Sequence, residues 1–308
     1  MDIAVIGSGM AGLATARILK DAGHSITIFE ALPGRGMDSH STEFEGGLID
    51  APLRVMNPHL WKNTLSLATY LGIETFPVRT YMACSWLFED RIETWLTTSR
   101  SRIGNFPIIN NRKGIQQYGW RLVKGMLQLK TAIAKFFKSK DQEITLAEFI
   151  NNNDIEEVFW HCVVMPVLYT ICTCSSKTIG EWPAKPLLIF LRQLTDGDAL
   201  LRMQGGTPAL VDKLIAGIQI HNGSAITQVK EQDSRVLVEN ALGEQYLFDR
   251  VIVATPTNKI EDFLNTEQFA DDIALLKKFK FEQGKLVIHT DQTVMPPKRK
   301  DWAVLSYM

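Results

Sequence analysis

Residues 1–30 follow a pattern that few folds can accommodate. A short apolar run, Ile3–Ile6, leads into the glycine-rich turn Gly7–Gly12 (GSGMAG), and an apolar helical pattern then continues to about Ala22. A second apolar run, Ser25–Phe29, ends on Glu30. Strand, glycine turn, helix, strand and acid in this order predict the βαβ unit of a Rossmann-like dinucleotide-binding domain.

The chemistry of a dinucleotide explains the residue types in this unit. Gly7 allows a tight bend, Gly9 lets the backbone approach a pyrophosphate, and Gly12 lets the helix pack closely on the strand. The helix offers unpaired N–H groups and the positive end of its dipole to the phosphates. Glu30, 18 positions after Gly12, can accept hydrogen bonds from ribose hydroxyls and would repel the 2′-phosphate of NADP. The turn residues predicted to bind the cofactor are Gly7, Ser8, Gly9, Met10, Ala11 and Gly12.

This pattern leaves NAD and FAD open, and also a βαβ unit whose glycine turn is incidental. Residues Ala31–His40 form a second glycine-rich loop, and Ile49–Val55 (IDAPLRV) follows it. Both segments resemble the flavin-containing amine oxidase superfamily, and most closely its predicted NAD/FAD-binding oxidoreductases associated with cyclopropane fatty acid synthases. The superfamily has a Gly-Gly-Arg-like turn after the acid. Here Met37 replaces the second glycine and no arginine follows it.

The resemblance implies that the cofactor is FAD, and it adds residues to the site. It implies that Ala31, Gly36 and Met37 belong to the cofactor site. Arg54 would neutralise the pyrophosphate or the reduced flavin, with a surface salt bridge as the alternative. The backbone of Val229 would meet the adenine ring.

The second half of the chain returns to the same superfamily order. Gln204–Leu214 is a glycine turn that leads into a helix, a hairpin is indicated around Gly243, and Asp249–Pro256 matches a D-x-V-I-x-A-x-P strand. The predicted fold class is α/β, with a Rossmann-like FAD/NAD(P)-binding domain and an interleaved α+β substrate cap. The FAD-binding domain is assigned to residues 1–60 and 200–262, and the cap to residues 61–199 and 263–308.

The remaining elements belong to the predicted cap. Helices are expected over Leu60–Leu71, after Thr145 and over the apolar segment Ile155–Cys174, and a strand over Tyr81–Phe88. Phe281–Asp291 is also predicted to be a strand. In amine oxidases a lysine on a nearby strand holds a water against flavin N5. Lys285 is the candidate here for that catalytic role, and a solvent-facing strand end is the alternative.

The segment Leu96–Lys140 contains ten Lys or Arg residues and no Asp or Glu. Within it a helix is predicted over Tyr118–Lys138, with an apolar face of Leu122, Met126, Leu129, Ile133 and Phe136. An apolar face flanked by lysines is typical of a helix at a membrane surface, so residues 118–138 are a candidate for peripheral membrane contact. The alternative is a solvated basic face on an ordinary amphipathic helix.

Composition limits the partners. The 33 basic residues against 34 acidic ones argue against a nucleic-acid-binding protein. Four cysteines, and an N-terminus that begins with a strand instead of a signal peptide, favour the cytoplasm. Cys172 and Cys174 lack a second pair at zinc-like spacing, so no metal site is predicted. The oligomeric state stays open.

Together these features predict an FAD-dependent oxidoreductase of the amine oxidase type, in which a hydride passes from a small or lipid-like substrate to flavin N5. One alternative is a flavin-dependent isomerase or desaturase of unsaturated lipids. Another is a non-catalytic nucleotide-binding remnant. Family members continue beyond the position of Met308 to a C-terminal FAD-binding segment, so the chain is expected to be either truncated or divergent there.

Overall fold

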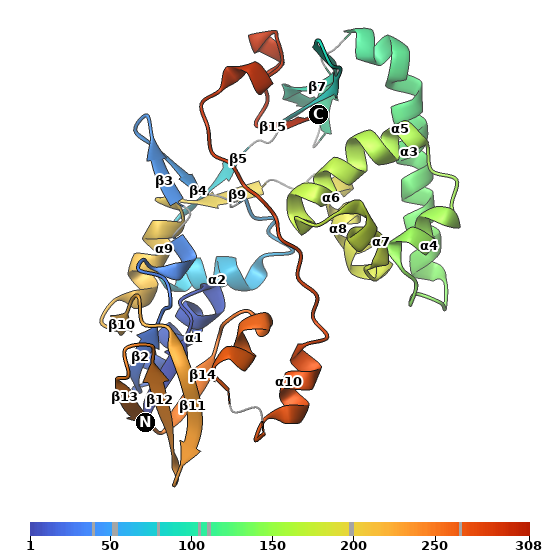
Figure 1. The fold of residues 1–308 in the computed structure, drawn as a ribbon. Coiled ribbons are helices and arrows are strands. Elements are labelled where there is room, and N and C mark those ends of the chain that lie inside the picture. The colour runs from blue at the N-terminus through green and yellow to red at the C-terminus, as the bar shows by residue number, and fades with distance from the viewer. Residues whose placement is uncertain are drawn as a thin grey trace. The chain divides into compact units, whose positions relative to one another are not determined.

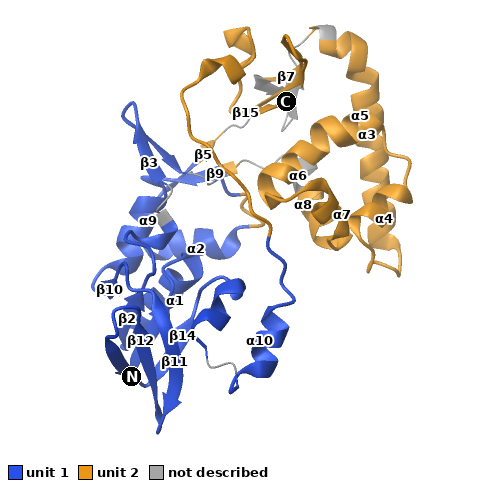
Figure 2. Cartoon of the chain, in the orientation of Figure 1, with its two compact units in different colours: residues 1–56, 61–76, 201–281 blue, residues 57–60, 77–200, 282–308 orange. Residues whose placement is uncertain are grey.

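The computed structural model describes residues 1–38, 41–50, 55–78, 81–103, 106–109, 112–196, 200–264 and 267–308. The chain forms two compact units, coloured separately in Figure 2. Unit 1 comprises residues 1–56, 61–76 and 201–281, and unit 2 comprises residues 57–60, 77–200 and 282–308. Each unit is therefore assembled from segments that are distant in the sequence.

A four-stranded parallel sheet with the order β10–β2–β1–β14 forms the centre of unit 1 (Figure 1). Its strands are Gln219–His221 (β10), Ser25–Phe29 (β2), Asp2–Ile6 (β1) and Arg250–Val253 (β14). Asp2 lies opposite Ser25, and Ile6 lies opposite Phe29. Because all four strands are parallel, the loops that follow them meet at one edge of the sheet, where α/β proteins bind their ligands.

The two faces of this sheet pack against different layers, because side chains alternate along a strand. Ile3 and Val5 belong to a core shared with three helices, and Ala4 and Ile6 belong to a core shared with an antiparallel sheet. The helices are α1 (Met10–Asp21), α2 (Lys62–Tyr70) and α9 (Gly206–Ile215). The antiparallel strands are β11 (Ile226–Gln232), β12 (Arg235–Asn240) and β13 (Gln245–Phe248). Unit 1 also contains the hairpin of β3 (Ser41–Phe44) and β4 (Gly47–Asp50), the 3-10 helices η1 (Gly36–Asp38) and η3 (Thr257–Asp262), and the helix α10 (Ala270–Leu276).

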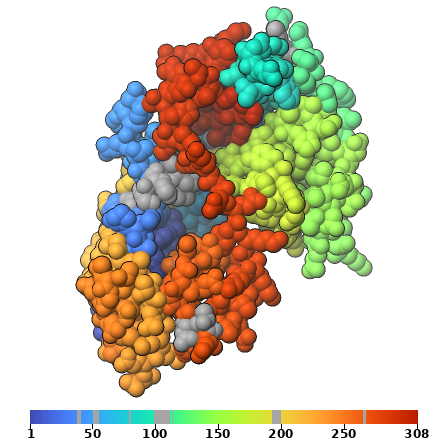
Figure 3. All heavy atoms as spheres, viewed as in Figure 1, coloured from blue at the N-terminus to red at the C-terminus, as the bar shows by residue number. Residues whose placement is uncertain are grey.

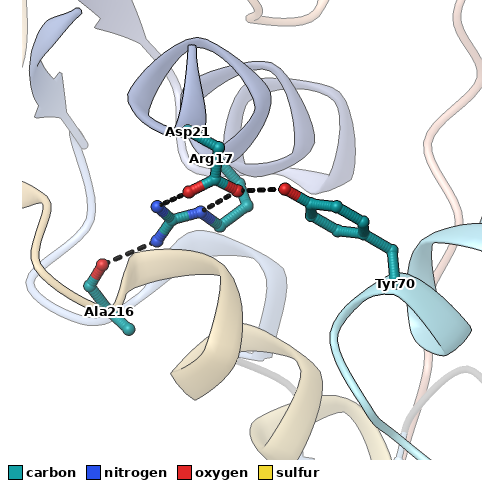
Figure 4. Close-up of polar contacts among 4 residues, drawn as sticks. All are labelled: Arg17, Asp21, Tyr70 and Ala216. Atoms are coloured by element: carbon teal, nitrogen blue, oxygen red, sulfur yellow. Dashed lines mark hydrogen bonds and ion pairs between the residues drawn. The ribbon is translucent and has the colours of Figure 1, made fainter. Parts of the chain in front are cut away.

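Polar contacts connect the three helices at the ends of α1, α2 and α9 (Figure 4). Arg17 of α1 forms an ion pair with Asp21 and donates a hydrogen bond to the Ala216 carbonyl, just after α9, at 2.7 Å. The Tyr70 hydroxyl at the end of α2 donates to Asp21 Oδ2 at 2.6 Å. The Arg17 and Tyr70 hydrogen bonds hold the pKa of the Asp21 carboxyl below its usual value.

Unit 2 combines a four-stranded sheet with a group of helices. The sheet has the order β15–β6–β7–β8, with β15 (Leu305–Tyr307), β6 (Met82–Leu87), β7 (Ile92–Ile103) and β8 (Phe106–Ile109). The helices are α3 (Arg112–Lys138), α4 (Leu146–Asn151), α5 (Glu157–Phe159), the π-helix η2 (Trp160–Val164), α6 (Met165–Cys172), α7 (Ser176–Glu181) and α8 (Ala184–Asp196). Two 3-10 turns, η4 (Gln292–Val294) and η5 (Arg299–Asp301), precede β15. The strand β5 (Thr75–Val78) pairs with β9 (Leu200–Met203), and the residues of both strands are divided between the two units.

The apolar face predicted on Tyr118–Lys138 as a candidate membrane contact is a core contact instead. Leu122, Leu129, Ile133 and Phe136 of α3 are buried in the same cluster as residues of α4, α5, α6 and α8. These side chains already have protein neighbours, so this face does not meet a membrane. Membrane contact through other side chains of residues 118–138 stays a prediction. Within the part of the chain that the structure describes, every helix is too short or too polar to span a lipid bilayer.

The strand predicted over Phe281–Asp291 is also wrong. This segment has no regular secondary structure, and its apolar residues Leu286, Val287 and Ile288 are exposed. A strand requires a neighbouring backbone with which to pair. Among the described residues this segment belongs to no sheet.

Two segments assigned to the cap pack with unit 1 in the structure. Residues 61–76 include α2, whose Ala68 is buried in the core beneath α1 and α9. Residues 263–281 begin with Phe263, which is buried with β11 and β12. The chain thus leaves the nucleotide-binding unit later than the change in sequence pattern indicates.

Candidate cofactor site

The turn after β1 has the backbone geometry that its glycines allow. Gly7 has a φ of +103°, and its N–H donates to the Phe29 carbonyl at 2.8 Å. A Cβ at Gly7 would lie 2.8 Å from the Ala254 carbonyl oxygen, and one at Gly12 would overlap the Gly7 carbonyl. A Cβ at Gly9, by contrast, would meet no described atom within 4 Å. Gly7 and Gly12 are therefore required by the packing of the protein, whereas Gly9 borders open space next to the turn.

The N-terminus of α1 faces this open space. Gly9 is the N-cap residue, and α1 has neither a side-chain cap nor an acidic residue in its first turn, as far as the described residues show. The first N–H groups of a helix have no partner within the helix, so they remain available here to an external acceptor. An anion such as a pyrophosphate satisfies them and also interacts favourably with the helix dipole. Met10, Ala11 and Gly12 supply these groups.

Glu30 is fixed at the end of β2 by hydrogen bonds to its carboxylate. Its Oε2 accepts from the Ser8 N–H at 2.8 Å and from the Ser8 hydroxyl at 2.6 Å, and its Oε1 accepts from the Leu32 N–H at 2.9 Å. Glu30 is only 7% exposed. A carboxylate accepts about four hydrogen bonds, so acceptor capacity remains for a ligand hydroxyl.

Gly36 and Met37 close around the same carboxylate. A Cβ at Gly36 would lie 2.5 Å from Ser8 Oγ and 2.6 Å from Glu30 Oε2, so only glycine fits here without a shift. The Met37 N–H donates to the Ser8 carbonyl at 3.1 Å. Ala31 is exposed directly beyond Glu30. The structure thus brings the second glycine-rich loop onto the first.

A backbone contact that the sequence analysis missed joins Glu30 to the segment after β10. The Glu30 N–H donates to the His221 carbonyl at 2.9 Å, and the Ser224 N–H donates to the Glu30 carbonyl at 2.8 Å. The His221 ring stacks on Phe29, with a centroid distance of 5.1 Å. The sequence signal for this contact was the short run Gln219–His221 before a glycine turn. In the structure this run is β10, the edge strand of the sheet.

Val229, the residue expected to meet the adenine ring, lies further along β11. It is buried, and its N–H donates to the Phe263 carbonyl at 2.8 Å. This amide is therefore already paired within the protein. The contact with adenine stays a prediction, and it would have to involve other atoms of Val229.

A buried hydroxyl at the end of β14 suits a polar ligand at this edge. Thr255 Oγ1 is buried without a hydrogen-bond partner among the described residues, and so is Thr257 Oγ1. The Thr255 side chain lies beside the Gly7 turn, with its Cγ2 atom 3.4 Å from a Cβ placed there. Since buried polar atoms are nearly always paired, an orphaned hydroxyl beside an uncapped helix end fits a phosphate-bearing group.

A small pocket of about 30 Å³ adjoins the turn through Met10 and Met37. The charged residues of its lining are Asp50 and Arg202, and Arg202 Nη2 lies 3.5 Å from Asp50 Oδ2. Asp50 also accepts from the Ser41 hydroxyl at 2.7 Å and from the Thr207 N–H at 3.2 Å, at the start of α9. The rest of the lining is mainly apolar and includes Met56, Trp61, Met203 and Leu210.

Two predicted site residues lie outside the described part of unit 1. Lys285 lies in unit 2, exposed in the extended segment whose atoms form part of the surface seen in Figure 3. Its catalytic role stays a prediction without a described partner that supports it. Arg54 lies outside the described residues.

Comparison with known proteins identifies the family of this chain. The family of flavin containing amine oxidoreductases matches residues 10–290. The chain belongs to this family. Membership of this family indicates FAD as the cofactor. The open space at Gly9, the uncapped α1 and the fixed Glu30 fit the dinucleotide part of that cofactor.

Individual proteins resemble parts of this chain. An L-amino-acid oxidase from Bungarus fasciatus is 25% identical over 154 residues, which are 48% of this chain and 30% of that protein. A redesigned putrescine oxidase triple mutant matches with a TM-score of 0.60 at 15% identity, covering 85% of this chain and 59% of the other. The fatty acid isomerase of P. acnes that produces CLA matches with a TM-score of 0.56 at 19% identity, covering 85% and 60%.

These structural similarities concern the fold, because the identities are low. An oxidoreductase from Methanosarcina mazei shows the same relation, with a TM-score of 0.60, 15% identity and coverage of 90% of this chain and 65% of the other. The chain thus spans less than two thirds of each of these solved structures and less than a third of the curated oxidase. The α/β fold with a Rossmann-like FAD-binding unit is confirmed.

Proposed function

We propose that this protein binds FAD at the carboxyl edge of the β10–β2–β1–β14 sheet and oxidises a small or lipid-like substrate. The observation that carries the proposal is the buried Glu30 carboxylate, which Ser8 and Leu32 hold beside the uncapped N-terminus of α1. When bound, a flavin accepts a hydride equivalent from a C–H bond of the substrate.

The residues of this chain contribute binding and orientation. The N–H groups of Met10, Ala11 and Gly12 would hold the pyrophosphate, and the open space at Gly9 lets the phosphates approach the backbone. Glu30 would accept a ribose hydroxyl with its remaining acceptor capacity. Since Ser8 and Leu32 already fix its carboxylate, this interaction needs little reorganisation of the protein.

The first experiment measures whether the purified chain carries FAD. We expect a flavin absorption spectrum in the visible region and release of stoichiometric FAD on heating. The substitution Gly9→Ala should abolish this, because its methyl group would occupy the space of the pyrophosphate while touching no described protein atom. Gly180→Ala in α7 of unit 2 is the control, since its Cβ would make only an ordinary contact of 3.6 Å with Ala147 Cβ.

The results separate the functional classes. A colourless protein that takes up no added FAD would overturn the proposal and favour the nucleotide-binding remnant. A wild-type FAD content in Gly9→Ala, with the same thermal stability, would show that the flavin binds elsewhere.

A redox-neutral isomerase or desaturase of unsaturated lipids is the second candidate, and the fold shared with a fatty acid isomerase favours it. Anaerobic mixing of the flavin-loaded protein with amines, amino acids and unsaturated fatty acids distinguishes the two. An oxidase substrate bleaches the flavin absorption stoichiometrically. An isomerase substrate is converted with no net bleaching.

A further inference from the structure

Helix α3 of unit 2 carries two apolar faces, and the core uses only one. The inner face contains Leu122 and Leu129, which are buried in the core of the unit. The outer face contains Trp120, Val123 and Leu127, which are 75%, 51% and 59% exposed. Their spacing of three and four residues places them in one row along the helix. We refer to Trp120, Val123 and Leu127 as the outer stripe.

Cations flank this stripe on both sides. At 100° per residue, Lys124 and Lys135 lie to one side of the Trp120–Leu127 row, and Lys130 lies to the other. All three lysines are exposed. The helix Arg112–Lys138 contains no Asp or Glu anywhere in its sequence. A long helix with lysines beside a row of exposed apolar residues has the composition of a helix that lies in a membrane interface.

Two acidic residues of unit 2 form polar contacts with side chains of α3. Glu156 forms an ion pair with Arg121, at 2.5 Å, and accepts from the Phe159 N–H. Asp154 accepts from Gln128 at 3.2 Å. At 100° per residue, Gln128 and Arg121 lie beyond Lys124 and Lys135 on the same side of the helix. The helix positions that hold these acids are therefore farther from the outer stripe than the two exposed lysines, which border it with positive charge.

We propose that the outer stripe of α3 docks on the surface of an anionic lipid membrane, with the helix axis parallel to that surface. Trp120 would enter the interface, where an aromatic ring with a polar N–H is favoured. Lys124 and Lys135 would contact lipid headgroups, whose negative potential attracts them. A lipid surface fits better than a protein partner, because lysine is depleted in protein–protein interfaces but common on the polar face of interfacial helices. This contact differs from the one predicted on Leu122, Leu129 and Ile133, which the core covers.

Co-sedimentation of the full chain with vesicles tests the proposal. We expect binding to phosphatidylcholine vesicles that contain phosphatidylglycerol, weakening as salt is added, and much weaker binding to phosphatidylcholine alone. The triple substitution Trp120→Gln, Val123→Gln and Leu127→Gln should lower the partition coefficient at least about tenfold, since it removes the apolar contact. The matched control is Leu87→Gln with Leu242→Gln, two leucines that are 67% and 77% exposed outside α3.

A second variant tests the charge separately. Lys124→Glu with Lys135→Glu should lower binding to the anionic vesicles at least about tenfold, while Lys177→Glu with Lys230→Glu, at exposed positions outside α3, should leave it nearly unchanged. Thermal unfolding of each variant verifies that the fold is retained.

Three results would overturn the proposal. The first is equal binding, or none, to the two kinds of vesicle. The second is unchanged vesicle binding by the folded triple variant. The third is a wild-type dimer in size-exclusion chromatography that the triple variant converts to a monomer, because the outer stripe would then be a contact between copies of the chain.

Discussion

Each of the two units contains a helical glycine at which an added Cβ would overlap a neighbouring atom, but the overlapped group is backbone in unit 1 and a side chain in unit 2. In unit 1, a Cβ at Gly12 of α1 would overlap the carbonyl oxygen of Gly7, which belongs to the same turn. In unit 2, a Cβ at Gly125 of α3 would overlap the Phe159 side chain, which belongs to a different helix. Backbone cannot move without disturbing the strand and helix it joins, whereas a side chain can rotate or shift. Unit 1 is therefore constrained by backbone within one short segment, and unit 2 by packing between distant segments.

The largest effect is expected from Gly12→Ala. The new methyl group collides with the Gly7 carbonyl, whose position is set by a φ of +103° and by the Gly7–Phe29 hydrogen bond. We expect a loss of unfolding free energy of about 3 kcal/mol or more, at the upper end of overpacking costs, together with loss of FAD. Urea unfolding and flavin content measure the two effects. Wild-type stability in this variant would show that the turn is not rigid and would remove the contrast between the units.

A smaller effect is expected from Gly125→Ala in unit 2. Its methyl group meets the Phe159 side chain, which can give way at a cost of about 1–3 kcal/mol of unfolding free energy. Gly119→Ala on the same helix is the control, because its Cβ would lie 3.5 Å from Ile115 Cγ2, an ordinary contact. There the higher helix propensity of alanine should stabilise the protein by roughly 0.5–1 kcal/mol. Thermal unfolding of both variants should give opposite signs, and equal shifts would contradict close packing at Phe159.

The difference between contacts within one segment and contacts between distant segments also explains which features the sequence could predict. Ser25–Phe29 is a strand at the predicted bounds, and the glycine turn, Glu30 and α1 lie as expected, because their spacing encodes contacts within one segment. Thr145 was expected to precede a helix, and it forms a capping box with Glu148 three residues later. These signals are local, and local signals can be read from one sequence.

Contacts between distant segments could not be predicted in this way. The apolar face of α3 was visible, but whether it meets lipid or the buried residues of α5 and α8 depends on the tertiary structure. The hydrogen bonds between Glu30 and the His221–Ser224 segment join residues almost two hundred positions apart. Phe281–Asp291 has the composition of a strand, but a strand also depends on a partner that composition does not specify.

Glu30→Gln tests whether the charge at the end of β2, as distinct from its shape, serves the cofactor. The amide keeps one acceptor oxygen, but its NH₂ group must face donors at Ser8 or Leu32. We expect FAD affinity to fall about tenfold, which corresponds to about 1.4 kcal/mol. Fluorescence titration with FAD measures this, and Glu231→Gln, at an exposed position in the same unit, is the control. An unchanged affinity would mean that the carboxylate only organises the loop.

The smallest effect on stability is expected from Tyr70→Phe, which removes one exposed hydrogen bond of unit 1. The Tyr70 hydroxyl donates to Asp21, and Arg17 pairs with the same carboxylate. The Arg17 and Tyr70 hydrogen bonds lower the pKa of Asp21 below its ordinary 3.8, and the hydrogen bond to Asp21 raises the pKa of Tyr70 above 10.0. We expect Tyr70→Phe to lower the melting temperature slightly at neutral pH.

The pH dependence of this difference identifies its source. A lowered Asp21 pKa contributes stability that is present above about pH 3.8 and is lost as the pH falls through the folded-state pKa. A raised Tyr70 pKa contributes stability that is present below about pH 10.0 and is lost as the pH rises through its folded-state value. The melting difference between wild type and Tyr70→Phe should therefore be largest between these limits and should shrink at both ends. Asp21→Asn should remove the acidic limb alone, because an amide cannot lose its acceptor by protonation in that range. A constant difference across the whole pH range would mean that Tyr70 stabilises the end of α2 through ring packing, and that the polar contacts of Figure 4 add nothing measurable to it.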